Sequence, residues 1–380
     1  MNFELESNQK LIRDMVREFA VNELEEKAVE IDKTGEFPWD SIKKMSELGL
    51  LGMIIPEQYG GGGMDFLSLA IAVEEISRVC ASTGIIVAVN NTLAAYPILK
   101  FGSEEQKKKY IPLLSQGKKI GAFGLTEPEA GSDPITLETT AQLDGNHYII
   151  NGSKRFIFNG QEAGIYIVFA KTDTEKAEEG LSAFIVERDT PGFSIGKPEE
   201  LMGVRATGNC TLLLNDCKVP KENLLGAEGQ GVSIALHSID TSRIDISAQQ
   251  VGIAQGALEA AVKYSKERVQ FGQAISEFGM IQNKLAEMDA KINAARLLVY
   301  WAATKKDSGT EPNSREAAIA KYMASEACMY TTHQAVQVYG GYGYTKEYPV
   351  ERFFRDAKVM EIYEGTTEVQ KQIIAAYLLK

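Results

Sequence analysis

The stretch "HYIINGSKRFIF", residues 147–158, decides the fold class, because its apolar residues follow a period of about two. That period is typical of a strand with one buried face. It continues through "GIYIVFAKT" (164–172), "LSAFIVERDTPGFSIG" (181–196) and "CTLLLNDCKVP" (210–220). These segments predict a compact β-domain, and within it Asn151-Gly152, flanked by apolar residues, predicts a hairpin turn.

Both flanks of this region show the spacing of amphipathic helices, with apolar residues three and four apart. The pattern covers "NQKLIRDMVREFAVNELEEKAVEID" (8–32) and "SLAIAVEEISRVC" (68–80) on one side, and "LAEMDAKINAARLLVYWAATKK" (285–306) on the other. Four consecutive glycines at 60–63 predict a loop in the first flank, because glycine is poor in helix and strand interiors.

The order along the chain is therefore helices, sheet, helices, which makes the predicted fold class α+β. We expect an N-terminal α-helical domain over residues 1–118, a middle β-domain over 119–226 and a C-terminal α-helical domain over 227–380. A β-domain between two helical domains creates clefts at the domain boundaries, where ligands commonly bind.

The composition excludes several classes of protein. With 380 residues, 44% hydrophobic and 24% charged, the chain can bury a large core. Its net charge of −12 without a basic tract argues against nucleic acid and anionic membranes as partners. Neither a signal peptide nor a run long enough to span a bilayer is expected, and the localisation predicted is cytoplasmic. Reduced core thiols, with no metal-ligand spacing, are predicted for Cys80, Cys210, Cys217 and Cys328.

The segment "GAFGLTEPEAGSD" (121–133) joins the first helical domain to the sheet. Its glycines permit close backbone approach, and the side chains of Thr126, Glu127 and Ser132 can hydrogen-bond a planar or phosphorylated ligand. An ordinary polar loop explains the same residues without any ligand.

Two further segments have both a structural and a functional interpretation. Gln337, Gly340 and Gly341 are predicted to end a helix on an exposed glycine pair, which either caps the helix or binds phosphate oxygens. The segment "ERFFRDAK" (351–358) predicts a structural ion-pair network.

Two residue pairs read most simply as surface contacts. Asp240 and Arg243, three apart, predict an ion pair on a helix surface. Arg268 and Phe271 predict a second contact, in which the arginine stem covers the aromatic ring.

The stretch "VMEIYEGTTEVQ" (359–370) places Glu364 in a loop before the last helix. Thr367 and Gln370 have the spacing of a capping box that would start this helix. From spacing alone, Glu364 is a solvated glutamate close to a helix N-terminus.

Together these segments resemble the acyl-CoA dehydrogenase family, most closely its short-chain, butyryl-CoA-type branch. The matching motifs run from end to end: "STGIIVAVNNTL", "GLTEPEAGSD", "NGSKRFIFNG", "GLSAFIVERDTPGFSIG", "VPKENLLGAEGQG", "ERVQFG", "QVYGGYGYTKEYPVERFFRDAK" and "EIYEGTTEVQ". The resemblance implies a middle β-barrel or sandwich, a C-terminal four-helix bundle, a noncovalent FAD and an acyl-CoA or enoyl-CoA thioester substrate. It also implies electron exchange with an electron-transferring flavoprotein, and a homotetramer in which a neighbouring subunit completes each flavin site.

The resemblance also implies roles for residues that match the family's motifs. The loop residues implied at the flavin are Phe123, Leu125, Thr126, Gly131 and Ser132, with Ser132 also touching CoA. Those implied at the isoalloxazine are Phe156, Ile157 and Phe158. Those implied to hold the neighbour's FAD are Arg268, Phe271, Gln337, Gly340 and Gly341. Asp240 and Arg243 are implied to contact the CoA of the substrate.

By the same resemblance, Glu364 is the catalytic base, with Tyr363 and Gly365 at the thioester and Thr366 and Glu368 beside the flavin. The α-proton of a thioester is a very weak acid, so the base needs a desolvated pocket that raises its pKa. The aromatic ring excludes water, and glycine lets a backbone N–H approach the thioester oxygen. The β-hydrogen would leave as hydride to the flavin.

Three residues depart from the family pattern. Phe158 stands where a hydroxyl residue near flavin N5 is usual, which favours electrons leaving the flavin. Gly279 stands where a flavin-contacting glutamine is usual, with Gln282 one turn away. Asp245 stands where a small residue usually follows the CoA-contacting arginine.

The leading interpretation is an oxidoreductase interconverting a short-chain acyl-CoA and its 2,3-enoyl-CoA. An enoyl-CoA reductase, an enzyme for branched or aryl acyl chains and an acyl-CoA oxidase remain alternatives. A non-catalytic flavin- or CoA-binding subunit of an electron-transfer complex is the alternative from another class, and the intact "YEGT" around Glu364 argues against it.

Overall fold

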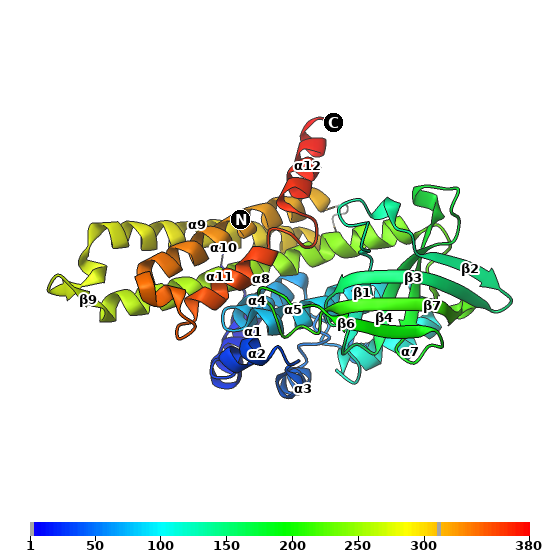
Figure 1. The fold of residues 1–380 in the computed structure, drawn as a ribbon, viewed down its shortest axis with the longest axis horizontal. Coiled ribbons are helices and arrows are strands. Elements are labelled where there is room, and N and C mark those ends of the chain that lie inside the picture. Colours follow the sequence, from blue (N-terminus) through cyan, green and yellow to red (C-terminus); the bar gives the residue numbers. More distant parts are fainter. Residues whose placement is uncertain (1–3, 310–312) are drawn as a thin grey trace.

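The computed structural model describes residues 4–309 and 313–380, and it confirms the order helices, sheet, helices (Figure 1). The N-terminal helices are α1 (Ser7–Phe19), α2 (Ala28–Thr34), α3 (Trp39–Glu47), α4 (Phe66–Ser77), α5 (Ala81–Ala88), α6 (Tyr96–Phe101) and α7 (Glu104–Ser115). A π-helical stretch, Val89–Ala95, joins α5 to α6. The four glycines after Tyr59 lie in a loop, as predicted.

The middle segment forms one mixed sheet of eight strands. The strands are β1 (Gly121–Gly124), β2 (Thr140–Asp144), β3 (His147–Ile157), β4 (Ile165–Lys171), β5 (Leu181–Glu187), β6 (Phe193–Pro198), β7 (Cys210–Pro220) and β8 (Leu224–Leu225). Their order is β6-β7-β3-β2-β4-β5-β8, with β1 parallel to β4. One apolar face of β4 and β5 packs with the helices around α7, and the other packs inside the sheet domain.

The predicted hairpin at Asn151-Gly152 is wrong. Strand β3 runs straight through this pair, and the hairpin turn is Gly145-Asn146, between Asp144 and His147. The register of β3 on β7 shifts between Ile150 and Gly152, which marks a β-bulge. A Cβ on Gly152 would lie 2.3 Å from Thr139 Oγ1, so the glycine permits close strand approach rather than a turn.

The C-terminal segment is a bundle of long helices. Its elements are α8 (Gly231–Glu267), the small hairpin β9 (Val269–Gln270) and β10 (Gln273–Ala274), α9 (Gly279–Asp307), α10 (Ser314–Tyr339), α11 (Val350–Val359) and α12 (Thr367–Leu378). In Figure 1 the first three helices run side by side, α11 lies along them, and α12 projects away from the body. The ribbon thus matches the four-helix bundle expected, with α12 as an extra arm.

Helix α8 passes from the sheet domain along the N-terminal helices and packs closely on α4. A Cβ on Gly252 would lie 2.2 Å from Glu74 O, and one on Gly256 would lie 2.1 Å from Arg78 O. These glycines let two backbones approach where a larger residue would force the helices apart.

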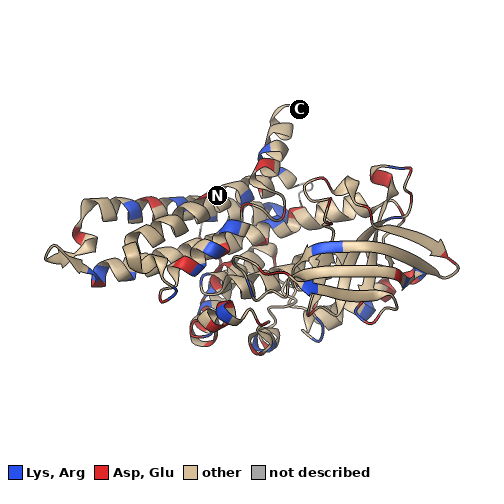
Figure 2. Ribbon diagram, viewed as in Figure 1, with Lys and Arg blue, Asp and Glu red and all other residues tan. Residues whose placement is uncertain are grey.

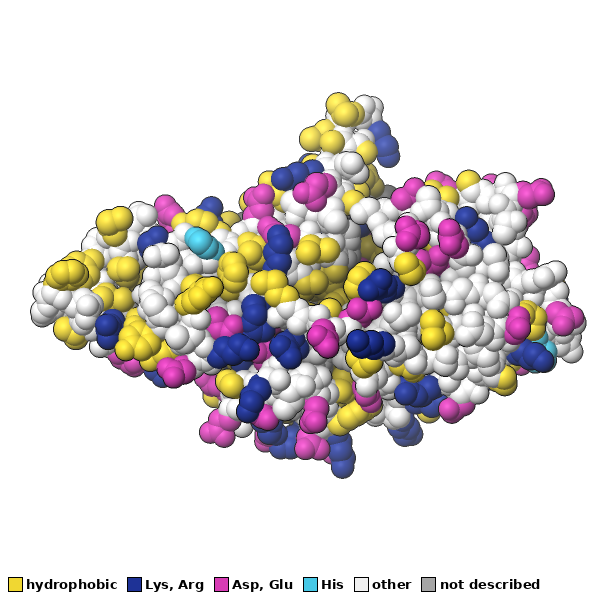
Figure 3. Space-filling view, viewed as in Figure 1, with side chains coloured by type: hydrophobic (Ala, Val, Ile, Leu, Met, Phe, Trp, Pro, Cys, Tyr) yellow, Lys and Arg dark blue, Asp and Glu magenta, His cyan; other side chains and the backbone are white. Residues whose placement is uncertain are grey.

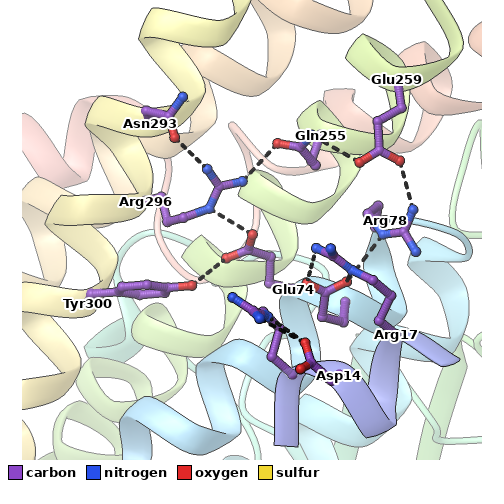
Figure 4. A network of polar contacts seen from close by, with 11 residues as sticks. Asp14, Arg17, Glu74, Arg78, Gln255, Glu259, Asn293, Arg296 and Tyr300 are labelled. Carbon is purple, nitrogen blue, oxygen red and sulfur yellow. Dashed lines mark hydrogen bonds and ion pairs between the residues drawn. The ribbon is translucent and has the colours of Figure 1, made fainter. Parts of the chain in front are cut away.

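A polar network also joins α4 to the bundle (Figure 4). Arg296 Nε donates to Glu74 Oε1 at 2.8 Å, and Tyr300 donates to the same carboxylate at 3.3 Å. Arg78 Nη1 lies 2.7 Å from Glu259 Oε2 on α8. The N-terminal helices and the C-terminal bundle, which precede and follow the sheet in sequence, are therefore joined directly by these polar contacts. The contacts hold α8 in position.

The ion-pair network predicted for "ERFFRDAK" is confirmed. Arg355 Nη2 lies 2.6 Å from Asp32 Oδ2 and also pairs with Glu351. Asp356 accepts a hydrogen bond from Val204 N at 2.6 Å, and Arg352 donates to a backbone carbonyl of the N-terminal domain. These contacts tie α11 to both other domains.

One stretch, Ala81–Phe101, is long and apolar enough by composition to cross a membrane, with a mean hydropathy of 1.3, contrary to the expectation from sequence. It is 78% buried inside the protein, as expected of a core helix. Lys, Arg, Asp and Glu are interspersed along the helices and the sheet in Figure 2, in agreement with the absence of a basic tract.

Candidate active site

Glu364 lies in the short connection between α11 and α12, residues 360–366, which we call the base connection. The main chain takes an unusual conformation there. The φ angles of Glu364 and Gly365 are +54° and +88°. The left-handed region is costly for a non-glycine residue and persists only where surrounding contacts hold it. Among the described residues, six non-glycines have positive φ, and three of them, Phe156, Phe271 and Glu364, are predicted site residues.

Four hydrogen bonds hold Glu364 and Gly365 by their backbone carbonyls. Arg243 Nε donates to Glu364 O at 3.0 Å, and Lys321 Nζ donates to Gly365 O at 2.8 Å. Gln370 Nε2 donates to both carbonyls, at 3.1 and 2.8 Å. Three helices, α8, α10 and α12, thus fix the position of Glu364 through its main chain.

One carboxylate oxygen of Glu364 is left without a hydrogen-bond partner. Its Oε2 atom is buried and has no partner among the described residues. Burial raises the pKa of Glu364 to about 7, although the charges of Arg243 and Lys321 act to lower it. A carboxylate with this pKa is a suitable general base near neutral pH, as predicted for this residue.

Tyr363 and Phe158 close the site from the side of the sheet. Tyr363 donates from its hydroxyl to Gln249 Oε1 on α8 at 2.7 Å, and burial raises its pKa well above the ordinary value. The Phe158 ring lies edge-on to Tyr363, with centroids 5.7 Å apart. The β-domain and the helical bundle therefore meet beside Glu364, which gives the base the apolar surroundings that proton abstraction requires.

The loop after β1 is held by a buried ion pair that sequence reasoning missed. Lys154 Nζ lies 2.6 Å from Glu127 Oε1, and both side chains are buried. The Glu127 carboxylate also accepts from Glu138 N and Thr139 N. Glu127 is therefore occupied within the chain, and the expectation that its side chain could bind a ligand is wrong. Its role is to fix the shape of the loop.

The other loop residues divide between the interior and the surface. Leu125 is buried, Phe123 packs on Phe169 with centroids 5.0 Å apart, and Arg155 N donates to Thr126 O at 2.8 Å. Gly131 and Ser132 are exposed.

At the end of β3 the side chains also split. Phe156 is half exposed, with φ +60°, and Ile157 is buried in the core of the sheet domain. A large exposed aromatic side chain held in a strained backbone conformation is typical of a ligand-facing position.

Asp240 and Arg243 form an ion pair on α8, with Arg243 Nη1 2.6 Å from Asp240 Oδ1. The expectation of a surface pair is wrong, because Arg243 is only 5% exposed. The Asp240 carboxylate also accepts from the Ser314 hydroxyl. This pair lies directly beside the connection that carries Glu364.

The last helix begins one residue earlier than predicted. Thr366 is the N-cap of α12, and its hydroxyl accepts from Val369 N at 3.3 Å. The capping box predicted at Thr367 and Gln370 is therefore wrong, since Gln370 instead holds the carbonyls of the base connection. Glu368 is exposed in the first turn, and hydrogen bonds to its own backbone and to Thr366 lower its pKa.

The remaining predicted residues gather at the far end of the bundle. Helix α10 ends at Tyr339, as predicted, and Arg268, Gly340 and Gly341 line one cavity of about 450 Å³. Phe271, in the turn of the β9–β10 hairpin, is 96% exposed. Its expected contact with Arg268 is replaced: Arg268 lies over the Tyr342 ring at 5.4 Å, and Phe271 meets Phe278.

This end of the bundle, which we call the bundle tip, is distant from the sheet domain in Figure 1. Apolar side chains gather over it in Figure 3, and its exposed apolar residues include Val269, Phe271, Met280 and Tyr344. Gln337 is exposed beside the glycine pair. The predicted flavin residues thus form two separate groups within one chain.

Family models match almost the whole chain. The acyl-CoA dehydrogenase N-terminal domain matches residues 6–118, the middle domain residues 122–217 and the C-terminal domain residues 229–379. The chain belongs to the acyl-CoA dehydrogenase family.

Similar proteins within the family share its full length. The short-chain specific acyl-CoA dehydrogenase of Clostridium acetobutylicum is 50% identical over 380 residues, 100% of both chains. The acryloyl-CoA reductase (NADH) of Anaerotignum propionicum is 46% identical over 382 residues, covering 100% of this chain and 96% of the relative.

Solved structures are similar to this chain over almost its whole length. A chain in the structure of the electron transferring flavoprotein of Acidaminococcus fermentans, described as a step toward a mechanism of flavin-based electron bifurcation, has a TM-score of 0.99 at 50% identity, with 100% of both chains covered. Butyryl-CoA dehydrogenase from Megasphaera elsdenii has a TM-score of 0.98 at 46% identity, again with 100% of both covered. An acyl-CoA dehydrogenase complexed with FAD from Bacillus anthracis has a TM-score of 0.93 at 37% identity, covering 99% of this chain and 67% of that one.

Two residues of this acyl-CoA dehydrogenase that depart from the family pattern are Gly279, which lies in open space, and Asp245, whose carboxylate oxygens have no partner among the described residues. A Cβ on Gly279 would meet nothing within 4 Å, and the nearby Gln282 amide already donates to Ser276 O at 3.0 Å. Asp245 is fully buried on α8.

Sequence reasoning also missed Lys321, Gln249 and the role of Gln370. All three contact the base connection from helices distant in sequence, and no local spacing connects them to it. For Lys154 a signal existed: it interrupts the buried face of β3, where a lysine is found only with a partner.

Proposed function

We propose that this acyl-CoA dehydrogenase acts on short-chain acyl-CoA thioesters, interconverting an acyl-CoA and its 2,3-enoyl-CoA. The observation that carries the proposal is Glu364, a partly buried carboxylate with a raised pKa and one buried, unpartnered oxygen, at the meeting point of the sheet and the bundle. The relatives from Clostridium acetobutylicum and Megasphaera elsdenii, named for short-chain substrates, support the chain length.

In the dehydrogenation direction, Glu364 accepts the α-proton of the thioester. Tyr363 and Phe158 exclude water from the carboxylate, and Gly365 permits close approach of the thioester to the backbone. Asp240 and Arg243 contact the CoA moiety beside the base connection. The redox chemistry would come from bound FAD, to which the β-hydrogen would be lost as a hydride.

The residues present fit FAD. Phe156 is half exposed in a strained conformation, Ser132 and Gly131 are open to solvent, and the loop between them is fixed by the Lys154–Glu127 ion pair. We assign the isoalloxazine contacts to the loop residues, to Phe156, Ile157 and Phe158, and to Thr366 and Glu368.

The bundle tip supports a homotetramer. Arg268, Gly340 and Gly341 line a cavity distant from Glu364, and Gln337 and Phe271 lie exposed close by, so we assign all five to the FAD of a neighbouring subunit. The exposed apolar residues of the tip would be covered in such an assembly. Size-exclusion chromatography with light scattering tests this assignment, and a stable monomer that retains tight FAD would contradict it.

Three further assignments complete the proposal. Electrons are exchanged with an electron-transferring flavoprotein, in line with the likeness to the chain from Acidaminococcus fermentans. The protein is cytoplasmic, in agreement with four buried free cysteines among the described residues. The domains are residues 1–118, 119–226 and 227–380.

Enoyl-CoA reduction is the second candidate direction. The 46% identical relative is named as an acryloyl-CoA reductase, and Phe158 supplies no hydroxyl that would stabilise a reduced flavin.

Replacing Glu364 by glutamine tests the proposed base. The wild-type holoenzyme should lose its flavin absorbance on anaerobic mixing with butyryl-CoA. Glu364→Gln should retain FAD and bind the thioester but bleach at least ~10²–10⁴-fold more slowly, because a carboxamide cannot accept the proton. Glu326→Gln, an exposed carboxylate on α10 with no assigned role in the site, is the matched control and should bleach within a few-fold of wild type. Rapid bleaching of the Glu364→Gln variant would place the base elsewhere.

A further inference from the structure

Asp245 has surroundings that a structural role does not explain. It lies in the middle of α8, is 0% exposed, and neither of its carboxylate oxygens makes a hydrogen bond within the described part of the chain. Buried polar groups are nearly always satisfied, and an unpaired one costs stability. Alanine at this position would favour the helix and remove that cost.

The nearest polar groups are committed elsewhere. Thr92, on the π-helical stretch, lies close enough to Asp245 to act on its pKa, which it lowers, but its hydroxyl hydrogen is donated to Ala88 O at 2.9 Å and neither Asp245 oxygen has a partner at hydrogen-bond geometry among the described residues. The guanidinium of Arg243 binds Asp240 and Glu364 O, and the Lys321 ammonium binds Gly365 O. Within residues 4–309 and 313–380, no cation pairs with Asp245.

Its protonation state follows from these surroundings. Burial raises the pKa of Asp245 well above its ordinary value, and the negative charge of Glu364 acts in the same direction. This direction favours the protonated carboxyl group, which has one O–H donor and one carbonyl acceptor.

Asp245 lies on α8 two residues after Arg243, within the wholly buried run from Thr241 to Ala254, and it is close enough to Glu364 for the two negative charges to interact. On the same helix, Ser242 Oγ and Gln250 Oε1 are also buried without partners among the described residues, as is Glu364 Oε2. With CoA at Asp240 and Arg243 and the reacting carbons at Glu364, the end of the acyl chain is directed toward this group of unsatisfied atoms.

We propose that Asp245 determines acyl specificity by hydrogen-bonding a hydroxyl group at the far end of a short acyl chain. This inference rests on the proposed function. A hydroxyl both donates and accepts, so it satisfies the two halves of a neutral carboxyl. An ammonium group would require Asp245 to ionise beside Glu364 and would stabilise the anionic base, which weakens it. A plain alkyl chain would leave the carboxyl buried and unpaired.

Steady-state kinetics of the holoenzyme with an artificial electron acceptor test the proposal. Wild type should show a kcat/KM about 10- to 100-fold higher for 4-hydroxybutyryl-CoA than for butyryl-CoA. Asp245→Ala should reverse this preference, and Asp245→Asn, which keeps a donor and an acceptor, should retain most of it. Ser247→Ala is the matched control, because Ser247 is equally buried on α8 but its hydroxyl is satisfied by Arg243 O.

The possible results separate the two proposals. Equal kcat/KM values for both substrates in wild type, or a preference that survives in Asp245→Ala with full FAD content, would overturn the role of Asp245 alone. A preference for 4-aminobutyryl-CoA over both would overturn the hydroxyl as the group recognised. Failure of every acyl-CoA to bleach the wild-type flavin would overturn the proposed function as well.

Discussion

Glu364→Gln should stabilise the protein at alkaline pH while removing its activity. Moving the pKa of a carboxyl from 4.5 to about 7 corresponds to about 3 kcal/mol, since each pH unit is worth ~1.36 kcal/mol. Below pH 4.5 the residue is protonated in both the folded and the unfolded chain, so it costs nothing. As the pH rises toward 7 the unfolded chain ionises first, and the folded protein loses stability until the full cost is present.

The assay is differential scanning calorimetry of the FAD-loaded wild type and variant at pH 5, 6, 7 and 8. For a 380-residue chain, the unfolding entropy of about 0.8 kcal/mol/K makes ~3 kcal/mol equivalent to about 4 °C in Tm. The Tm difference between Glu364→Gln and wild type should therefore be small at pH 5 and reach about 4 °C at pH 8. Glu326→Gln is the control, because that carboxylate is exposed on α10 and has no burial cost for the substitution to remove.

A Tm difference that is the same at pH 5 and pH 8 would refute the reasoning. It would mean that the glutamine acts through packing, and that Glu364 titrates in the folded protein as it does in the unfolded chain. A lower Tm for the variant at pH 8 would show that the carboxylate is stabilised by Arg243 and Lys321 more than it is penalised by burial.

Two other changes test the flavin side of the site. Phe158→Thr should raise the flavin reduction potential by about 10–30 mV, the equivalent of one hydrogen bond of ~0.5–1.5 kcal/mol, as measured by spectroelectrochemical titration; an unchanged or lowered value would leave Phe158 a packing residue. Lys154→Met should destabilise the protein by ~3–5 kcal/mol in urea unfolding and weaken FAD retention, because Glu127 is left buried without its partner. Adding Glu127→Gln to it should recover part of both losses, and an additive double variant would count against the ion pair.

Hydrophobic periodicity alone predicted the order of helical and sheet regions along the chain. It did not predict the turns and bulges within the sheet. The period of two located the β-domain because half-buried strands leave that pattern in any sequence. The turn at Asn151-Gly152 was misassigned because a bulge and a hairpin use the same residues, and only the partner strand distinguishes them. Lys154 shares the inner face of β3 with Tyr148 and Ile150, so the alternation places it inside but does not identify its partner Glu127.

Only the site residues that belong to family motifs could be predicted from the sequence. Glu364 and its neighbours were placed by resemblance, since spacing alone described a solvated glutamate at a helix entrance. Its burial depends on Phe158 and Gln249, which lie far away in sequence and meet Tyr363 only in the fold. The cations that hold the connection, Arg243 and Lys321, are likewise brought together by helix packing, which local sequence does not encode.

The three clamps on the base connection touch only main-chain oxygens, which every amino acid possesses. The scaffold therefore holds the location at residue 364 independently of the side chain that occupies it. A residue tolerant of positive φ, such as Asn or Asp, could be installed there without dismantling the clamps. For protein engineering, residue 364 is therefore a position where the side chain can be exchanged while the backbone stays anchored. The reacting group can be varied in length and acidity, so new chemistry could be selected at this position without rebuilding the fold.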